Sequence, residues 1–149
     1  MWQVGVWEPE GSLSPLLAGL TQAAPCLIRA CCAPDPTWNV PLDLLVVAPH
    51  APRPLHLPAC TAALVPGEVP PPRFSTPPQV LLSYGCASWD TLTLSSLTET
   101  RAAVAVQRAF PRLGGGVVER QELVLPYGGP APLPFLAQVG TALLLGVIG

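Results

Sequence analysis

Apolar and polar positions form their clearest pattern between Val80 and Leu125. The apolar run Val80–Ser83 ends at Tyr84 and Gly85, and after a polar loop three segments of strand character follow, at 90–97, 101–110 and 117–125. A continuous apolar run bounded by turn residues is typical of a buried strand, and alternation is typical of strands with one exposed face. The pattern predicts a central strand that leads into an antiparallel meander, with no helix inside 91–96 or 102–108.

The N-terminal half has the pattern of parallel strands around one helix. Apolar runs predict strands at 2–7, 26–31, 42–48 and 59–65, and a turn at Pro66-Gly67 closes the last of them. The third run is apolar on both faces at its end, as in a covered parallel sheet. Leucines recur at helical spacing after the first run, which predicts a helix over 15–24, capped by Ser12 or Ser14.

Two proline-rich segments, 49–58 and 70–78, interrupt the chain. The first cannot be helical, because proline lacks an amide donor and clashes with the preceding turn. We interpret the second as a surface connection rather than a domain linker, because neither side alone has enough apolar sequence for a core. Residues 1–149 are therefore expected to form a single α/β domain.

A second helix is predicted over Leu133–Ile148, which is apolar around most of its circumference and is interrupted by Gln138 and Thr141. The run is short for a membrane span and has no basic flanks, which favours a helix buried on the sheet. Such a helix must bury more than one face. We expect that Leu143 and Leu144 do not both fit against the sheet alone, and that one contacts another element or a second copy.

Together these elements predict an α/β fold. It consists of a small mixed sheet with an N-terminal parallel βαβ-like part, a C-terminal antiparallel meander and a buried C-terminal helix.

Composition limits the possible partners. Charged residues make up 11% of the chain, against about 25% in ordinary soluble domains. Too few charges are available to cover a monomer, which predicts a homo-oligomer or a protein partner. The net charge of −2 argues against nucleic acid. All seven cationic residues are arginines, so no lysine can form a Schiff base or serve a phosphate loop.

The chain has five cysteines, an odd number, and its sequence shows no export signal. Both observations argue against a disulfide framework, and the second indicates a cytoplasmic protein. A zinc site could be imagined from Cys31, Cys32, Cys60, His50 and His56. His56 and Cys60 alone have a plausible spacing, so we predict no metal and no cofactor.

Catalytic motifs are also missing. The chain has no G-x-S-x-G elbow, and Cys86, the best-placed nucleophile, is more simply a small loop residue. No catalytic residue is assigned, and the pattern favours a non-enzyme.

Charged residues suggest two local structures. At the predicted first helix, Glu8 and Glu10 would repel an anion, so an acid-capped helix start is the preferred interpretation. Arg108, Glu119, Arg120 and Glu122 predict cross-strand ion pairs on a solvated face.

The best candidate for a ligand or partner surface is the loop from Tyr84 to Asp90, since ligands in open α/β sheets gather beyond the carboxyl ends of strands. The candidate ligand-binding residues are Tyr84, Gly85, Ser88 and Asp90. The alternative is a turn between strands with a packed Trp89.

Residues 80–148 contain, in this order, Tyr84-Gly85, the meander, Leu123–Pro126, Gly128-Gly129 and an Ala- and Leu-rich helix that ends at Leu145–Val147. With these motifs the segment resembles the end of the central domain of Mur ligases. The resemblance implies a similar strand, meander and helix order, with 42–48 as the preceding strand. Residues 48–52 lack the family's Asn and Asp, and the glycine-rich, lysine-bearing phosphate loop is absent. ATP binding and ligation are therefore not implied. Ser83–Gly85 and Asp90–Thr93 are also similar to segments of small uncharacterised proteins of anaerobic Gram-positive bacteria, which implies no activity.

Three hypotheses follow. The first is a non-catalytic α/β domain that acts by protein interaction or self-association, in the form of a degenerate Mur-ligase-like scaffold. The alternative is a small-molecule or nucleotide-binding protein that uses the loop Tyr84–Asp90. The third is an enzyme that uses Cys86 or a histidine.

Overall fold

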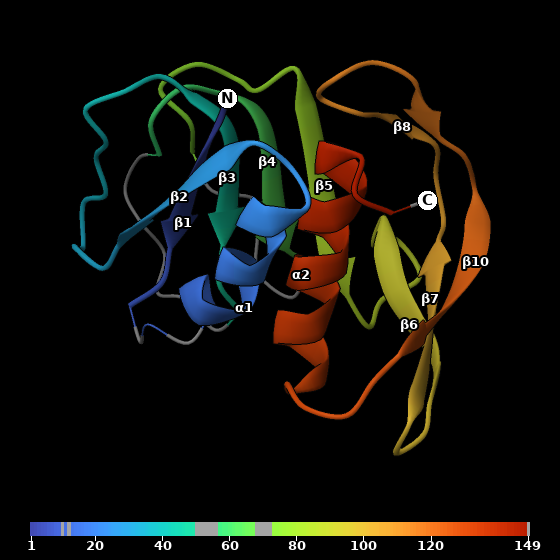
Figure 1. Cartoon of the computed structure of the whole chain (residues 1–149). Coiled ribbons are helices and arrows are strands. Elements are labelled where there is room, and N and C mark those ends of the chain that lie inside the picture. Colours follow the sequence, from blue (N-terminus) through green and yellow to red (C-terminus); the bar gives the residue numbers. More distant parts are fainter. Residues whose placement is uncertain (10, 12, 50–56, 68–72, 149) are drawn as a thin grey trace.

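The fold is built on one eight-stranded sheet, seen in a computed structural model that describes residues 1–9, 11, 13–49, 57–67 and 73–148. The strands lie in the order β10-β7-β6-β5-β4-β3-β1-β2 (Figure 1). Their bounds are β1 (Trp2–Trp7), β2 (Cys26–Cys31), β3 (Leu42–Val47), β4 (Cys60–Pro66), β5 (Val80–Gly85), β6 (Leu92–Leu97), β7 (Arg101–Val106) and β10 (Gln121–Pro126). β8 (Phe110–Pro111) and β9 (Val117–Val118) form a separate two-stranded sheet. The helices are α1 (Ser14–Ala18), the 3₁₀ helix η1 (Gly19–Gln22) and α2 (Pro132–Leu145). The predicted mixed α/β class is confirmed.

Within the set β1 to β6, all neighbouring strands pair in parallel. The chain moves outward from β1 to β2 through α1 and then returns to β3 on the other side of β1. Because parallel crossovers are right-handed, this reversal requires the connection after β2 to cross the face opposite α1. Trp38, Leu57 and Phe74 pack there on the second face of the sheet, over Leu45 and Val65. Proline-rich connections thus cover a face that helices cover in most parallel sheets, and this explains why residues 44–47 are buried on both sides.

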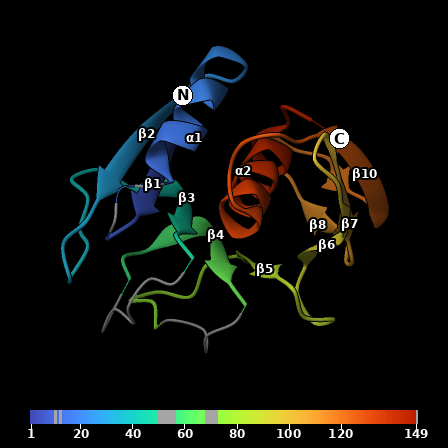
Figure 2. The same cartoon turned by 90° about the horizontal axis from the view of Figure 1, so that it is seen from below.

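The antiparallel part begins beyond β5. β6 pairs with β5 only at Tyr84–Leu92 and Gly85–Thr93, and it then continues past the end of β5. β7 and β10 follow in antiparallel order, and this part of the sheet curls around α2 (Figure 2). The predicted meander is confirmed, but the third predicted segment, 117–125, is divided between β9 and β10. Gly115 and Gly116, with φ of 105° and 81°, form the turn of the additional β8–β9 hairpin.

Helix α2 lies on the same face as α1 and runs from the carboxyl edge to the amino edge of the parallel strands (Figure 1). A Cβ at Gly140 would lie 2.8 Å from side-chain atoms of Leu64 and Leu92, so this glycine permits close contact with β4 and β6. The helix ends at Gly146 in a left-handed conformation, where Val147 N donates to Ala142 O. The predicted helix therefore ends three residues earlier than Ile148.

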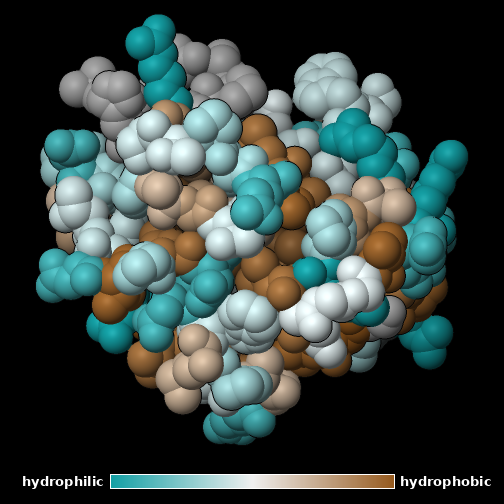
Figure 3. Space-filling model, turned by 90° about the horizontal axis from the view of Figure 1, so that it is seen from above, coloured by the Kyte–Doolittle hydropathy of each residue, from teal (hydrophilic) through white to brown (hydrophobic). Residues whose placement is uncertain are grey.

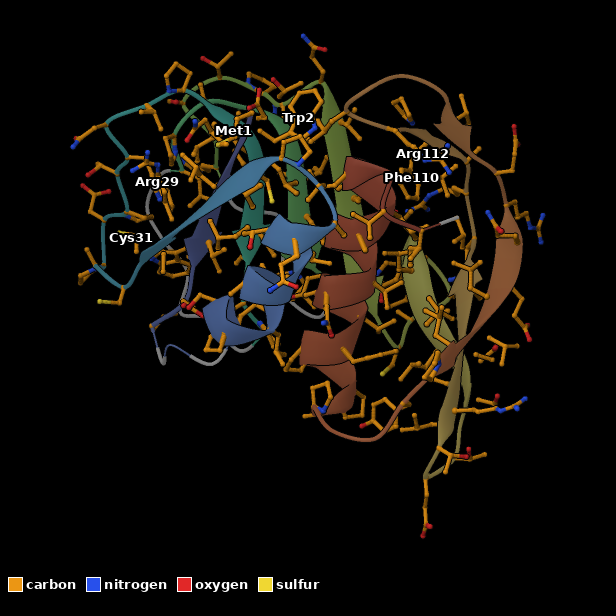
Figure 4. All side chains as sticks on the ribbon, viewed as in Figure 1. Met1, Trp2, Arg29, Cys31, Phe110 and Arg112 are labelled. Atoms are coloured by element: carbon orange, nitrogen blue, oxygen red, sulfur yellow. The ribbon has the colours of Figure 1, made fainter. Side chains whose placement is uncertain are left out.

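Leu143 and Leu144 are both fully buried, although the sheet covers only one side of α2. Gln138 Nε2 donates to Leu16 O in α1 over 3.3 Å, and Leu113 N, next to β8, donates to Leu144 O over 3.0 Å. Phe110 and Arg112 lie beside the C-terminal end of α2 (Figure 4). The prediction that another element must cover this helix is confirmed, and that cover comes from α1 and the β8–β9 region of the same chain.

The first helix differs from its prediction. Residues 14–18 form an α-helix, and residues 19–22 continue as a 3₁₀ helix. Ser14 lies inside the helix, whose N-cap is Leu13 without a side-chain cap, and Ser12 lies outside the described residues. The cap comes instead from Glu8, whose Oε2 accepts from Leu13 N over 2.6 Å and from Ser14 N over 2.7 Å.

The low charge content leaves apolar atoms at the surface. Seen from the amino ends of the parallel strands, hydrophobic side chains reach the surface across the middle of the molecule (Figure 3). Within the described part of the chain, no helix has the length and apolar character needed to cross a bilayer.

Candidate functional site

The loop between β5 and β6 is held in place from several sides at the carboxyl edge of the sheet. Asp90 Oδ2 accepts from Ala87 N over 3.0 Å, and Asp90 N donates to Ala87 O over 3.1 Å. The Gln107 amide, just beyond β7, donates to Asp90 O over 2.7 Å and to Ala87 O over 3.4 Å. These bonds close a tight turn and tie it to β7.

A second set of bonds fixes Thr91, at the start of β6. Thr91 N donates to Ser83 Oγ over 3.3 Å, and Thr91 Oγ1 accepts from Ser83 N over 3.4 Å. Arg108 Nη2 donates to the same Oγ1 over 2.9 Å. Arg108 therefore points to this loop, which differs from the predicted ladder of ion pairs on a solvated face.

Asp90 is buried at this turn, with 1% of its surface exposed. A Cβ at Gly67 would lie 1.6 Å from Asp90 Oδ1, and one at Gly85 would lie 2.6 Å from Oδ2. The two glycines, at the ends of neighbouring strands, thus make room for the carboxyl group. Oδ1 has no hydrogen-bond partner among the described residues. Buried polar atoms are normally paired, so this oxygen is an exception that needs an explanation.

A cavity of about 350 Å³ lies between this loop and the start of α2. Its lining residues are Tyr84, Gly85, Cys86, Ala87, Trp89, Asp90 and Leu133. The volume falls within the range of small-molecule sites, and such sites typically combine apolar walls with few polar groups. The Tyr84 hydroxyl donates to Val47 O over 2.5 Å, which ties the end of β5 to the end of β3.

A second cavity of about 310 Å³ lies on the other face of the sheet. It is lined by Val65, Pro66, Gly67, Leu81, Ser83, Trp89 and Arg108. Trp89, 65% exposed, contributes to both cavities, and Leu81 is 46% exposed. The Asp90 carboxyl group, packed on Gly67, lies where the walls of the two cavities meet.

Of the four candidate residues, Tyr84, Gly85 and Asp90 line the first cavity. Ser88 is exposed and is not among the lining residues, and Trp89 is exposed rather than packed. Sequence reasoning missed Gly67, Gln107 and Leu133, which come from three distant segments. The turn predicted at Pro66-Gly67 was the one signal for Gly67, and it gave no reason to place that turn beside Asp90.

The other candidate loop, after β1, is closed by its own acid. Glu8 is 2% exposed, and its carboxylate occupies the backbone N–H groups that an anion would use. The preferred interpretation, an acid-capped helix start, is confirmed for Glu8, whereas Glu10 lies outside the described residues.

The cysteines are free thiols, and Cys86 is exposed in the wall of the first cavity. Burial raises the pKa of Cys60 to about 11 and also raises the pKa of Cys26, so both stay protonated near neutral pH. Within the described residues, no group of three or more His, Cys, Asp or Glu side chains could hold a metal ion. His50 and His56 lie outside those residues.

Comparisons with models of protein families, with curated proteins and with solved structures found no match to this chain.

Proposed function

We propose that this chain binds a small organic molecule in the cavity between the loop Tyr84–Asp90 and the start of α2. The observation that carries the proposal is the buried Oδ1 of Asp90, which lacks a hydrogen-bond donor among the described residues. Leaving a buried acceptor unpaired costs about 1–3 kcal/mol. A ligand that supplies the donor recovers this free energy on binding.

The rigidity of the loop supports the same proposal. Before any ligand arrives, Gln107 donates to both ends of the turn, at Ala87 O and Asp90 O, and Arg108 donates to Thr91 directly after it. Binding to a preorganised site loses little conformational entropy, so even a small ligand can bind with useful affinity.

Binding without catalysis is part of the proposal. The resemblance of residues 80–148 to Mur ligases supports a degenerate scaffold of that kind, because the sequence lacks the phosphate loop on which ATP chemistry depends. The enzyme hypothesis needs a histidine close to Cys86 or a serine. Both histidines lie outside the described residues, so that hypothesis stays a prediction.

A fragment screen on ¹⁵N-labelled protein tests the proposal. We expect hits to shift the amide signals of residues 84–90 and Leu133, together with the indole N–H signal of Trp89. Leu133→Trp puts a larger side chain into the wall of the cavity and should abolish these shifts. Leu97→Trp is the matched control, because Leu97 is 42% exposed on β6 and does not line the cavity. The proposal is contradicted if the hits shift signals of other residues instead, or if they shift the same signals in Leu133→Trp.

The second candidate function is self-association through the opposite face of the sheet. Leu81 and Trp89 are exposed, and both line the second cavity together with Arg108. Trp and Arg are frequent among the residues that dominate protein interfaces. Analytical ultracentrifugation should detect a dimer that Trp89→Ser weakens and Leu97→Ser leaves intact. A chain that stays monomeric at all concentrations contradicts this second candidate.

A further inference from the structure

We infer that the cavity beside Asp90 takes a cationic ligand, an ammonium or amidinium group on a compact apolar body. This inference rests on the proposed function and adds the chemical class of the ligand. It follows from the charge of the cavity wall, from the geometry of the Asp90 carboxylate and from the start of α2.

The wall carries negative charge from Asp90, and none of its other described lining residues is Arg, Lys or His. Arg108, which lies beyond β7, donates to Thr91 and lines the second cavity. A cation placed against the carboxylate gains a charge-assisted hydrogen bond, which is about twice as strong as a neutral one. An anion in the same place would be repelled in a poorly solvated site.

The carboxylate can present an acceptor to such a ligand. Ala87 N occupies one oxygen of Asp90, and the other has no partner within the described residues. Rotation of a carboxyl group about its Cβ–Cγ bond is soft, since terminal torsions of this kind are broad. Both oxygens move together in such a rotation, so a small turn can bring Oδ1 toward the cavity that Asp90 lines while Oδ2 shifts relative to Ala87 N.

The start of α2 does not reverse this preference, although a helix N-terminus usually attracts anions. Pro132 and Pro134 occupy the first turn and have no N–H groups. Phe135 N already donates to Ala131 O over 3.0 Å. Leu133 is left as the one N–H donor among the first three helical residues, too few to hold an anion.

The other lining residues of the cavity determine which apolar group the ligand can carry. The exposed ring of Trp89 and the side chain of Leu133 border the cavity, and Tyr84 closes it toward the core. An aromatic face attracts a cation within about 6 Å of the ring centroid. A ring-sized group that carries one ammonium matches this combination.

A charge series on one molecular frame tests the inference on the wild-type protein. Benzylammonium, benzyl alcohol and benzoate share a ring and differ in charge. Titrations followed by the indole N–H signal of Trp89 and the amide of Ala87 should give an affinity for benzylammonium at least about tenfold above that for benzyl alcohol. Benzoate should bind more weakly than either. If benzoate or benzyl alcohol binds as tightly as benzylammonium at these signals, the cavity is a ligand site and the cationic class is wrong. If none of the three shifts these signals, the inference fails, and the fragment screen then decides separately whether the proposed function stands.

Two variants, each of which removes one negative charge, test whether the affinity for benzylammonium depends on Asp90 itself or on the overall charge of the protein. Asp90→Asn keeps an oxygen for Ala87 N and should bring the affinity for benzylammonium down to that for benzyl alcohol. Glu122→Gln removes the same charge from β10, outside both cavities, and should change the affinity less than about twofold. Equal losses in both variants would overturn the role of Asp90. Should Asp90→Asn not fold, the wild-type charge series decides alone.

Discussion

Glu8 and Asp90 are two buried acids at the same edge of the sheet, and they differ in how their carboxylates are satisfied. Glu8 comes directly after β1 and is 2% exposed, and Asp90 lies beyond β5 and is 1% exposed. Glu8 Oε2 accepts two backbone N–H groups, whereas Asp90 accepts one through Oδ2 and none from the described residues through Oδ1. The comparison shows that burial alone does not mark a site, and that the unmet hydrogen bond is the more informative feature.

The difference arises from the element that comes after each strand. After β1 the chain enters a helix, and the start of a helix offers N–H groups without partners. After β5 the chain turns within six residues into β6, so no helix start is available. In the loop that contains Asp90, the backbone groups instead form hydrogen bonds with the Gln107 side chain and with each other inside the turn. Glu8 thus stabilises the fold by capping α1, whereas Asp90 is held in position by the bonds of its loop.

The largest expected effect comes from removing the structural acid. Glu8→Ala deletes two charge-assisted bonds and leaves Leu13 N and Ser14 N unpaired beside the core. We expect a loss of about 3–4 kcal/mol in the free energy of unfolding, measured by urea denaturation. Glu122→Gln, on an outer strand, should change it by less than about 0.5 kcal/mol. A loss under about 1 kcal/mol in Glu8→Ala would remove the contrast between the two acids.

The second prediction concerns the space around Asp90. In Gly67→Ala the new Cβ would lie 1.6 Å from Asp90 Oδ1, so the loop must shift. Such overpacking costs about 2–3 kcal/mol in urea denaturation. Asp90→Ala in the same chain should recover at least half of that loss, because it removes the atoms in conflict. Gly19→Ala is the matched control, since no atom lies within 4 Å of the position that its Cβ would take and its φ is −63°. If the double variant recovers nothing, Gly67 is constrained by something other than Asp90.

The third prediction concerns the stability of the fold at alkaline pH, which limits the pH range in which the two acids can be compared. Burial raises the pKa of Cys60 from 9.0 to about 11, so between these values the unfolded chain has lost a proton that the native chain keeps. Stability therefore falls as the pH rises from about 9 to about 11. Because Cys60 is only partly buried, we expect about 1–2 kcal/mol rather than the full value of two pKa units. Cys60→Ala should lose this alkaline component, whereas the exposed Cys32→Ala should retain it. An unchanged alkaline slope in Cys60→Ala would contradict the assignment.

Much of the fold was predictable from the sequence, because apolar periodicity reports which faces are buried. The runs at Trp2–Trp7, Cys26–Cys31 and Val80–Ser83 are strands, and the all-round apolar helix is covered on several sides. The β8–β9 hairpin was missed because its strands have two residues each, too few to show alternation. The site was predictable only in part. Tyr84 and Asp90 are close in sequence. Leu133 lines the cavity, Gly67 packs against Asp90 and Gln107 bonds to the turn through pairing and packing between distant segments, which local patterns do not encode.

The smallest effect should come from the acid of the proposed site. Asp90→Asn removes a buried charge that has one protein partner, and it keeps an oxygen for Ala87 N. Since a buried charge without full pairing contributes little to stability, we expect a change within about 1 kcal/mol, in the direction of a more stable protein. Glu8→Gln has the same chemistry but weakens two satisfied bonds, and it should cost about 1–2 kcal/mol. Urea denaturation of the two isosteric variants side by side, below about pH 9, measures the contrast directly. A loss above about 2 kcal/mol in Asp90→Asn would mean that Asp90 supports the fold as Glu8 does, and its unpaired oxygen would then no longer argue for a ligand.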